Sequence, residues 1–130
     1  EFQSLQSYLR NELQAVKKKL SVFSPEILIG TAGTVTTLSA LKNNIYPYDP
    51  GKIHGSKFSY QEAKSILYDL KGKSLKQRLQ LKPLEPGRED LIIVGTTIVL
   101  ETMLAFDCKM LTVSEYSLRE GLILKAMNGE

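Results

Sequence analysis

The sequence is poor in the side chains that form disulfides, bind transition metals or span membranes. Its 130 residues include one cysteine, Cys108, and one histidine, His54. An internal disulfide and a His/Cys metal centre are therefore excluded within the chain, and we expect a reducing, cytoplasmic compartment. The longest uncharged apolar run, residues 91–100, is too short to cross a bilayer, so we expect no membrane partner.

The overall composition is that of a soluble globular chain. Hydrophobic residues make up 42% of the sequence and charged residues 24%, and the length suits one domain or part of one. The net charge of +3 suits an anionic ligand, but it is too small to indicate nucleic-acid binding. Because the chain starts at Glu1 inside a helical pattern and without a methionine, we expect a fragment of a longer protein.

A glycine-rich turn between a predicted strand and a predicted helix is the most informative local pattern. Residues 27–29 are an apolar run that predicts a buried strand, and the chain then passes through Gly30 and Gly33 into a helical pattern over residues 35–41. Glycines allow a backbone to approach a phosphate closely, and the first amides of a helix carry partial positive charge. The same spacing is also typical of an ordinary tight turn, so the pattern alone assigns no function.

The rest of the chain is predicted to be mainly helical around one more strand. Apolar periodicity and capping boxes give, in chain order, a helix over 4–20, a loop over 46–51, a brief extended stretch over 52–55, helices over 59–70 and 74–81, a buried helix within 88–106, a strand over 110–113 and a helix over 117–127. Both strands lead through a turn into a helix, which favours parallel neighbours in an α/β sheet. Two strands make a poor sheet, so we expect further strands from outside this chain or from another molecule.

Candidate binding residues gather at the predicted carboxyl ends of the two strands, where ligands bind in open α/β sheets. Arg119 either adds positive charge to an anion site there or is an exposed or ion-paired arginine. Glu120 is explained as the carboxylate of a capping box, and Glu115 is a loop acid near the same edge. His54 has the chemistry of a general base, with loop structure or a ligand contact as the favoured alternatives.

Four segments, in order, resemble those of one known family. They are Gly30-Thr31-Ala32-Gly33-Thr34, His54-Gly55, Arg88-Glu89-Asp90 with Gly95, and the run from Val113 to Leu122 that contains Leu118-Arg119-Glu120-Gly121. Together they look like the exopolyphosphatase / guanosine pentaphosphate phosphatase (Ppx/GppA) family. The resemblance covers nearly the whole chain.

The resemblance implies a partial ribonuclease-H-like domain of the actin-like ATPase superfamily. Residues 1–130 would be the latter half of the second actin-like domain, with a few short parallel strands in predominantly helical surroundings. Family members release terminal phosphate from inorganic polyphosphate or guanosine pentaphosphate, usually with magnesium. We therefore expect a phosphate or nucleotide cleft lined by Gly30, Thr31, Gly33, Thr34 and Arg119, with His54 and Glu115 as further ligand contacts.

The same resemblance also implies what this chain lacks. The family's other phosphate-binding turns and its catalytic glutamate lie upstream, so we expect no catalytic residue and no metal ligand here. The missing N-terminal part of the protein is then a partner, and an incomplete sheet favours self-association. A non-catalytic sensor for polyphosphate or guanosine alarmones is the alternative. A different actin-like ATPase or sugar kinase is a third hypothesis, against which the segment 118–121 argues.

Overall fold

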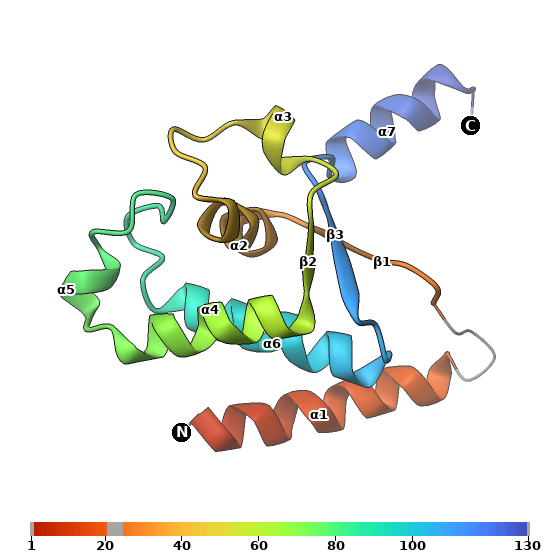
Figure 1. Ribbon diagram of the computed structural model, residues 1–130. Helices are drawn as coiled ribbons and strands as arrows, with labels where there is room; N and C mark the ends of the chain where they lie inside the picture. Colours follow the sequence, from red (N-terminus) through yellow and green to blue (C-terminus); the bar gives the residue numbers. More distant parts are fainter. Residues whose placement is uncertain (1, 21–24, 130) are drawn as a thin grey trace.

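The structure is a small α/β arrangement in which helices pack against a three-stranded sheet (Figure 1). The computed structural model describes residues 2–20 and 25–129. The strand order is β1-β3-β2, with β1 at Leu28–Thr31, β2 at Lys57–Ser59 and β3 at Met110–Ser114. β1 and β3 are parallel, as the sequence predicts, and β2 pairs with β3 in the antiparallel sense. β2 was not predicted, because three residues are too few to show a strand period.

The helices follow the predicted order closely. They are α1 (Phe2–Lys19), α2 (Gly33–Asn43), α3 (Pro50–Ile53), α4 (Tyr60–Gly72), α5 (Leu75–Arg78), α6 (Leu91–Ala105) and α7 (Leu118–Met127). The capping boxes predicted at Ser59, Ser74 and Ser117 all form. Two predictions for the segments between β1 and β3 were wrong. The stretch 52–55 is not extended, because Asp49 caps the short α3, and the helix predicted over 74–81 ends at Arg78.

The core lies where α2, α4 and α6 meet β3. Six consecutive residues of α2, 35–40, are buried, because this helix is enclosed by the sheet and by α4 and α6. α6 is the buried helix that its apolar pattern predicts, and Phe58 of β2 closes the cluster with Leu38, Ile53 and Met103. In Figure 1, α1, α4 and α6 lie together below α2. This packing fixes the start of α2 against the end of β1.

A buried carboxylate attaches α1 to α6. Glu101 of α6 is only 3% exposed, and Arg10 of α1 donates to both of its oxygens, over 2.8 and 3.1 Å. Gln6 adds a third hydrogen bond at 2.9 Å. The hydrogen bond to Glu101, followed by its charge, raises the pKa of Arg10. Because α1 has no buried residue of its own among those described, this polar contact specifies where the helix docks.

Two apolar surfaces of the fold are uncovered. Ile27 and Ile29 are 68% and 64% exposed, so β1 is not the buried strand that its apolar run predicts but an edge strand. Within the residues described, α7 contains no buried position, and in Figure 1 it extends away from the other helices. Its exposed apolar residues are Leu118, Leu122, Ile123, Leu124 and Met127. None of the helices in residues 2–20 and 25–129 has the length and hydropathy that crossing a bilayer requires.

The Arg10–Glu101 contact yields a stability prediction. Glu101→Ala removes three hydrogen bonds to a carboxylate, and we expect it to lower the free energy of unfolding by about 2 kcal/mol. Arg10→Ala leaves the buried carboxylate without its cation, so it should destabilise the chain more than Arg10→Lys does. Urea unfolding measures both effects. Glu12→Ala, at an exposed position of the same helix, is the control, and equal losses for Arg10→Ala and Glu12→Ala would contradict the assignment.

The free edge of β1 predicts self-association. A strand edge with exposed isoleucines offers unpaired amides and carbonyls to another chain. We expect the 130-residue chain to sediment as a concentration-dependent oligomer in analytical ultracentrifugation. Ile29→Lys puts a charge on the exposed face of β1 and should shift the population toward monomer, whereas the matched change Tyr68→Lys on α4 should not. A monodisperse monomer of the unmodified chain would overturn this prediction.

Candidate functional site

The carboxyl ends of β1 and β3 lie side by side, as predicted. Thr31 pairs in register with Ser114, and the Thr31 hydroxyl donates a hydrogen bond of 2.9 Å to the carbonyl oxygen of Tyr116. The two predicted turns are therefore in direct contact. The boundaries need one correction, because Gly30 and Thr31 belong to β1 and the first turn is reduced to Ala32 before α2 begins.

The glycines of this segment serve close packing within the protein. A Cβ on Gly30 would lie 2.9 Å from both methyl groups of Val35 and 3.0 Å from Leu111, so the missing side chain lets α2 fold back on β1. A Cβ on Gly33 would lie 2.9 Å from Cζ of Arg88 and would overlap its guanidinium. Gly30 therefore has a structural role, whereas Gly33 admits a cation to the start of α2.

Arg88 is a candidate site residue that no local pattern in the sequence indicates. Its guanidinium lies over Gly33 and is held from the other side by Glu85, with Nε 2.9 Å from the carboxylate. The N-cap residue of α2, Ala32, makes no side-chain cap in the described structure, so the amides of Gly33 and Thr34 keep their partial positive charge. The one signal in the sequence was the Arg88 segment of the family resemblance.

The starts of α2 and α6 meet beside this guanidinium. A Cβ on Gly95 would lie 2.7 Å from the Thr34 methyl group, so the glycine allows the two helices to touch. A hollow of about 370 Å³ opens there, lined by Gly33, Thr34, Thr37, Arg88, Leu91, Ile92, Val94, Gly95 and Ile98. Backbone amides and a guanidinium at one end of an open hollow make this a candidate site for an anion.

His54 and Glu115 are brought together at the end of β3. The backbone N–H of Glu115 donates to Nδ1 of His54 over 3.2 Å, and the His54 ring stacks on Tyr116 with centroids 4.5 Å apart. The Tyr48 hydroxyl donates to the Glu115 carboxylate. Burial, followed by this hydrogen bond, raises the pKa of Tyr48, while the Thr36 hydroxyl acts in the opposite direction. Tyr48 thus remains a neutral donor between α2 and the turn after β3.

Arg119 and Glu120, neighbours in the first turn of α7, differ in their contacts. Glu120 accepts hydrogen bonds from the backbone and hydroxyl of Ser117 at 2.6 and 2.8 Å, and these bonds lower its pKa to about 2. Its predicted role as a capping carboxylate is confirmed. The Arg119 side chain is 86% exposed and lies 3.8 Å from Glu120. No contact in the described structure joins Arg119 to Gly33 or Thr34, so its place in an anion cleft stays a prediction.

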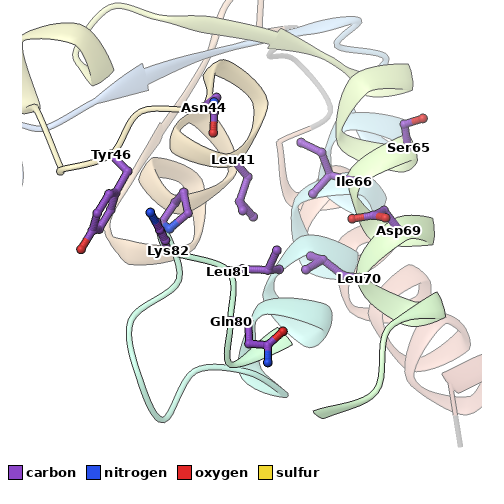
Figure 2. A pocket seen from close by; sticks show the side chains of 11 residues that line it. Leu41, Asn44, Tyr46, Ser65, Ile66, Asp69, Leu70, Gln80, Leu81 and Lys82 are labelled. Carbon is purple, nitrogen blue, oxygen red and sulfur yellow. The ribbon is translucent and has the colours of Figure 1, made fainter. Parts of the chain in front are cut away.

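A second hollow, of about 510 Å³, lies at the other end of α2 (Figure 2). Leu41, Ile66, Leu70 and Leu81 form its apolar part, and Tyr46 and Lys82 stand on one side. α2 is 11 residues long, so its two ends are roughly 16 Å apart. The hollow is therefore separate from the site at Gly33.

The described residues offer little to a metal ion. No group of three or more His, Cys, Asp or Glu side chains gathers in the part of the chain that the structure describes. The Glu115 carboxylate, in the turn after β3, already accepts a hydrogen bond from the Tyr48 hydroxyl. The described part of the chain thus presents no preformed cluster for Mg²⁺, an ion that is usually held by one or two carboxylates together with water and substrate phosphates.

Comparison with known proteins gives consistent matches. Exopolyphosphatase 2 of Mycobacterium tuberculosis is 34% identical over 122 residues, which cover 89% of this chain and 38% of that protein. The crystal structure of a Ppx/GppA family member from Aquifex aeolicus matches with a TM-score of 0.90 and 32% identity, over 98% of this chain and 40% of that one. An exopolyphosphatase from Cytophaga hutchinsonii, at 22% identity, matches in fold with a TM-score of 0.82.

These matches bear out the resemblance and the actin-like fold. The chain spans about two fifths of the length of the relatives that it matches. The model of the Ppx/GppA phosphatase family matches residues 1–130, which is the whole sequence. The chain therefore belongs to the Ppx/GppA phosphatase family.

Proposed function

We propose that this chain forms the latter half of the second actin-like domain of a longer phosphoanhydride hydrolase, and that it supplies one wall of the substrate cleft. The partial coverage of the relatives supports this reading. So does the exposure of Ile29 on the edge strand β1, because a neighbouring strand would cover such a position.

The observation that carries the proposal is the Arg88 guanidinium lying over Gly33 at the uncapped start of α2. A delocalised cation and free helix amides together attract a phosphate group. In the reaction, water attacks the terminal phosphorus in line and the shortened phosphate chain leaves. Gly33, Thr34 and Arg88 would bind and orient the anion, while the general base is a glutamate outside this chain.

Inorganic polyphosphate is the first substrate to test, because the curated relative at 34% identity is named an exopolyphosphatase. Guanosine pentaphosphate is the second, since both end in a phosphoanhydride. We propose that the metal ligands lie in the rest of the protein, because the described residues show no cluster of three or more His, Cys, Asp or Glu side chains. The single cysteine supports a cytoplasmic enzyme.

If the catalytic residues lie outside this chain, the 130-residue chain should be inactive alone. We expect negligible phosphate release from polyphosphate or guanosine pentaphosphate, with or without magnesium, because the attacking machinery lies elsewhere. The parent protein extended upstream of Glu1 should release phosphate under the same conditions, and the ratio of the two rates identifies the substrate. Robust phosphate release by the isolated chain would refute the proposal that the catalytic residues lie outside it. A folded parent that binds these anions without hydrolysis would favour the sensor alternative.

Arg88 provides the sharpest test of the cleft wall. In the parent protein, Arg88→Ala should lower kcat/KM roughly 100-fold, as expected when a donor to a developing phosphate charge is lost. Gly33→Ala should lower it as well, because the new methyl group displaces the guanidinium. Lys125→Ala and Gly121→Ala are the controls, since Lys125 is an exposed cation of α7 and a Cβ on Gly121 meets open space. Equal losses for Arg88→Ala and Lys125→Ala, at unchanged Tm, would place the anion elsewhere.

A further inference from the structure

The position of His54 is fixed by the end of β3. The residue follows α3, and backbone hydrogen bonds of 2.8 Å join Gly55 N–H to the Val113 carbonyl and Val113 N–H to the Ser56 carbonyl. The histidine ring is therefore held beside the turn that leads to α7. It is exposed there, at the same edge of the sheet as the start of α2.

A main-chain contact determines which ring nitrogen carries the proton. Nδ1 of His54 accepts a hydrogen bond from the backbone N–H of Glu115. A nitrogen that accepts has no hydrogen of its own, so the neutral ring carries its proton on Nε2. The donor is a backbone group, so this arrangement does not depend on the side chain at position 115.

The ring is also held from one face. It stacks on Tyr116 at an interplanar angle of 35°, and the carbonyl of Tyr116 accepts from Thr31 at the end of β1. The Glu115 carboxylate is occupied by the Tyr48 hydroxyl. The free polar atom of the imidazole is therefore Nε2–H, a donor at the edge where α2 begins.

We propose that His54 acts as a hydrogen-bond donor, through Nε2–H, to a phosphate oxygen of the bound anion. This inference rests on the proposed function, because it takes the anion to lie at the carboxyl edge of β1 and β3. With His54 included, the hydrogen-bond donors that face the anion extend from Gly33 and Arg88 across the end of β3. Phosphate oxygens are strong acceptors, and a chain of phosphates offers several in a row to such a wall.

The same geometry removes two other roles for His54. A general base needs a free lone pair, and so does a metal ligand, but Nε2 carries the hydrogen and Nδ1 is committed to Glu115. Either role would require breaking the contact with the Glu115 amide. The donor role is a form of the ligand contact that the sequence favours for His54 over a general base.

The test uses the single histidine as its own reporter. Two-bond proton–nitrogen correlation spectra of the uniformly ¹⁵N-labelled 130-residue chain, recorded at about pH 8.5, contain one histidine ring and distinguish its tautomers directly. We expect the Nε2–H tautomer. Titration with sodium tripolyphosphate should shift the His54 Nε2 signal together with the amides of Gly33 and Thr34.

Two variants test the chemistry of the donor. His54→Gln places an amide N–H near the position of Nε2 and should keep most of the tripolyphosphate affinity. His54→Asn is shorter and cannot reach, so we expect binding roughly ten times weaker, as for the loss of one charge-assisted hydrogen bond. Glu115→Gln keeps the backbone N–H and removes a negative charge, so it should retain the tautomer and tighten binding.

Each outcome separates this inference from the proposed function. An Nδ1–H tautomer in the free chain would overturn the inference whatever binds. Shifts at Gly33 and Thr34 without a change at His54 would also overturn it and leave the proposed cleft intact. Equal affinity of His54→Gln and His54→Asn would reject the donor role. No shift at either place would reject the anion wall itself.

Discussion

The parallel pairing of β1 and β3 is the constraint on which the rest of the structure depends. Parallel neighbours cannot be joined by a hairpin, so the chain must return from the carboxyl end of one strand to the amino end of the other. Residues 32–109 make this return and contain α2 to α6 together with β2. Their packing forms the core, and it also brings Arg88 back to the start of α2, where β1 ends. The polar site is thus a consequence of the crossover.

Signals that span three or four residues predict this fold well. Each capping box predicted in the sequence forms, because the two hydrogen bonds of such a box join residues three apart and need nothing from the rest of the chain. The parallel pair was also predictable, since both strands lead into helices. The exposure of β1 was not predictable, because an apolar run such as that of Ile27 and Ile29 looks the same at a free edge as in a core. The short β2 depends on its pairing with β3, which lies some fifty residues away.

The candidate site shows the same limit. The glycine-rich segment was correctly placed between strand and helix, but the reason for its glycines was not readable from sequence. Gly30 and Gly95 allow close packing within the protein, and only Gly33 opens the backbone to a charged group. That group is Arg88, which is distant in sequence and comes close only through the packing of α6 against α2. Spacing alone therefore predicts the turn but not its cation.

The groups that face the proposed anion are largely set by the main chain. The amides of Gly33 and Thr34 follow from the start of α2, and the tautomer of His54 follows from the backbone N–H of Glu115. Such donors are positioned by the fold and cost little reorganisation when charge develops on a phosphate. The guanidinium of Arg88 adds a charged side chain to these main-chain donors. A wall of this kind can hold a phosphate chain while leaving attack and metal binding to the opposite side of a cleft. In the proposed function, binding of the anion and attack on it are thus divided between two parts of one protein.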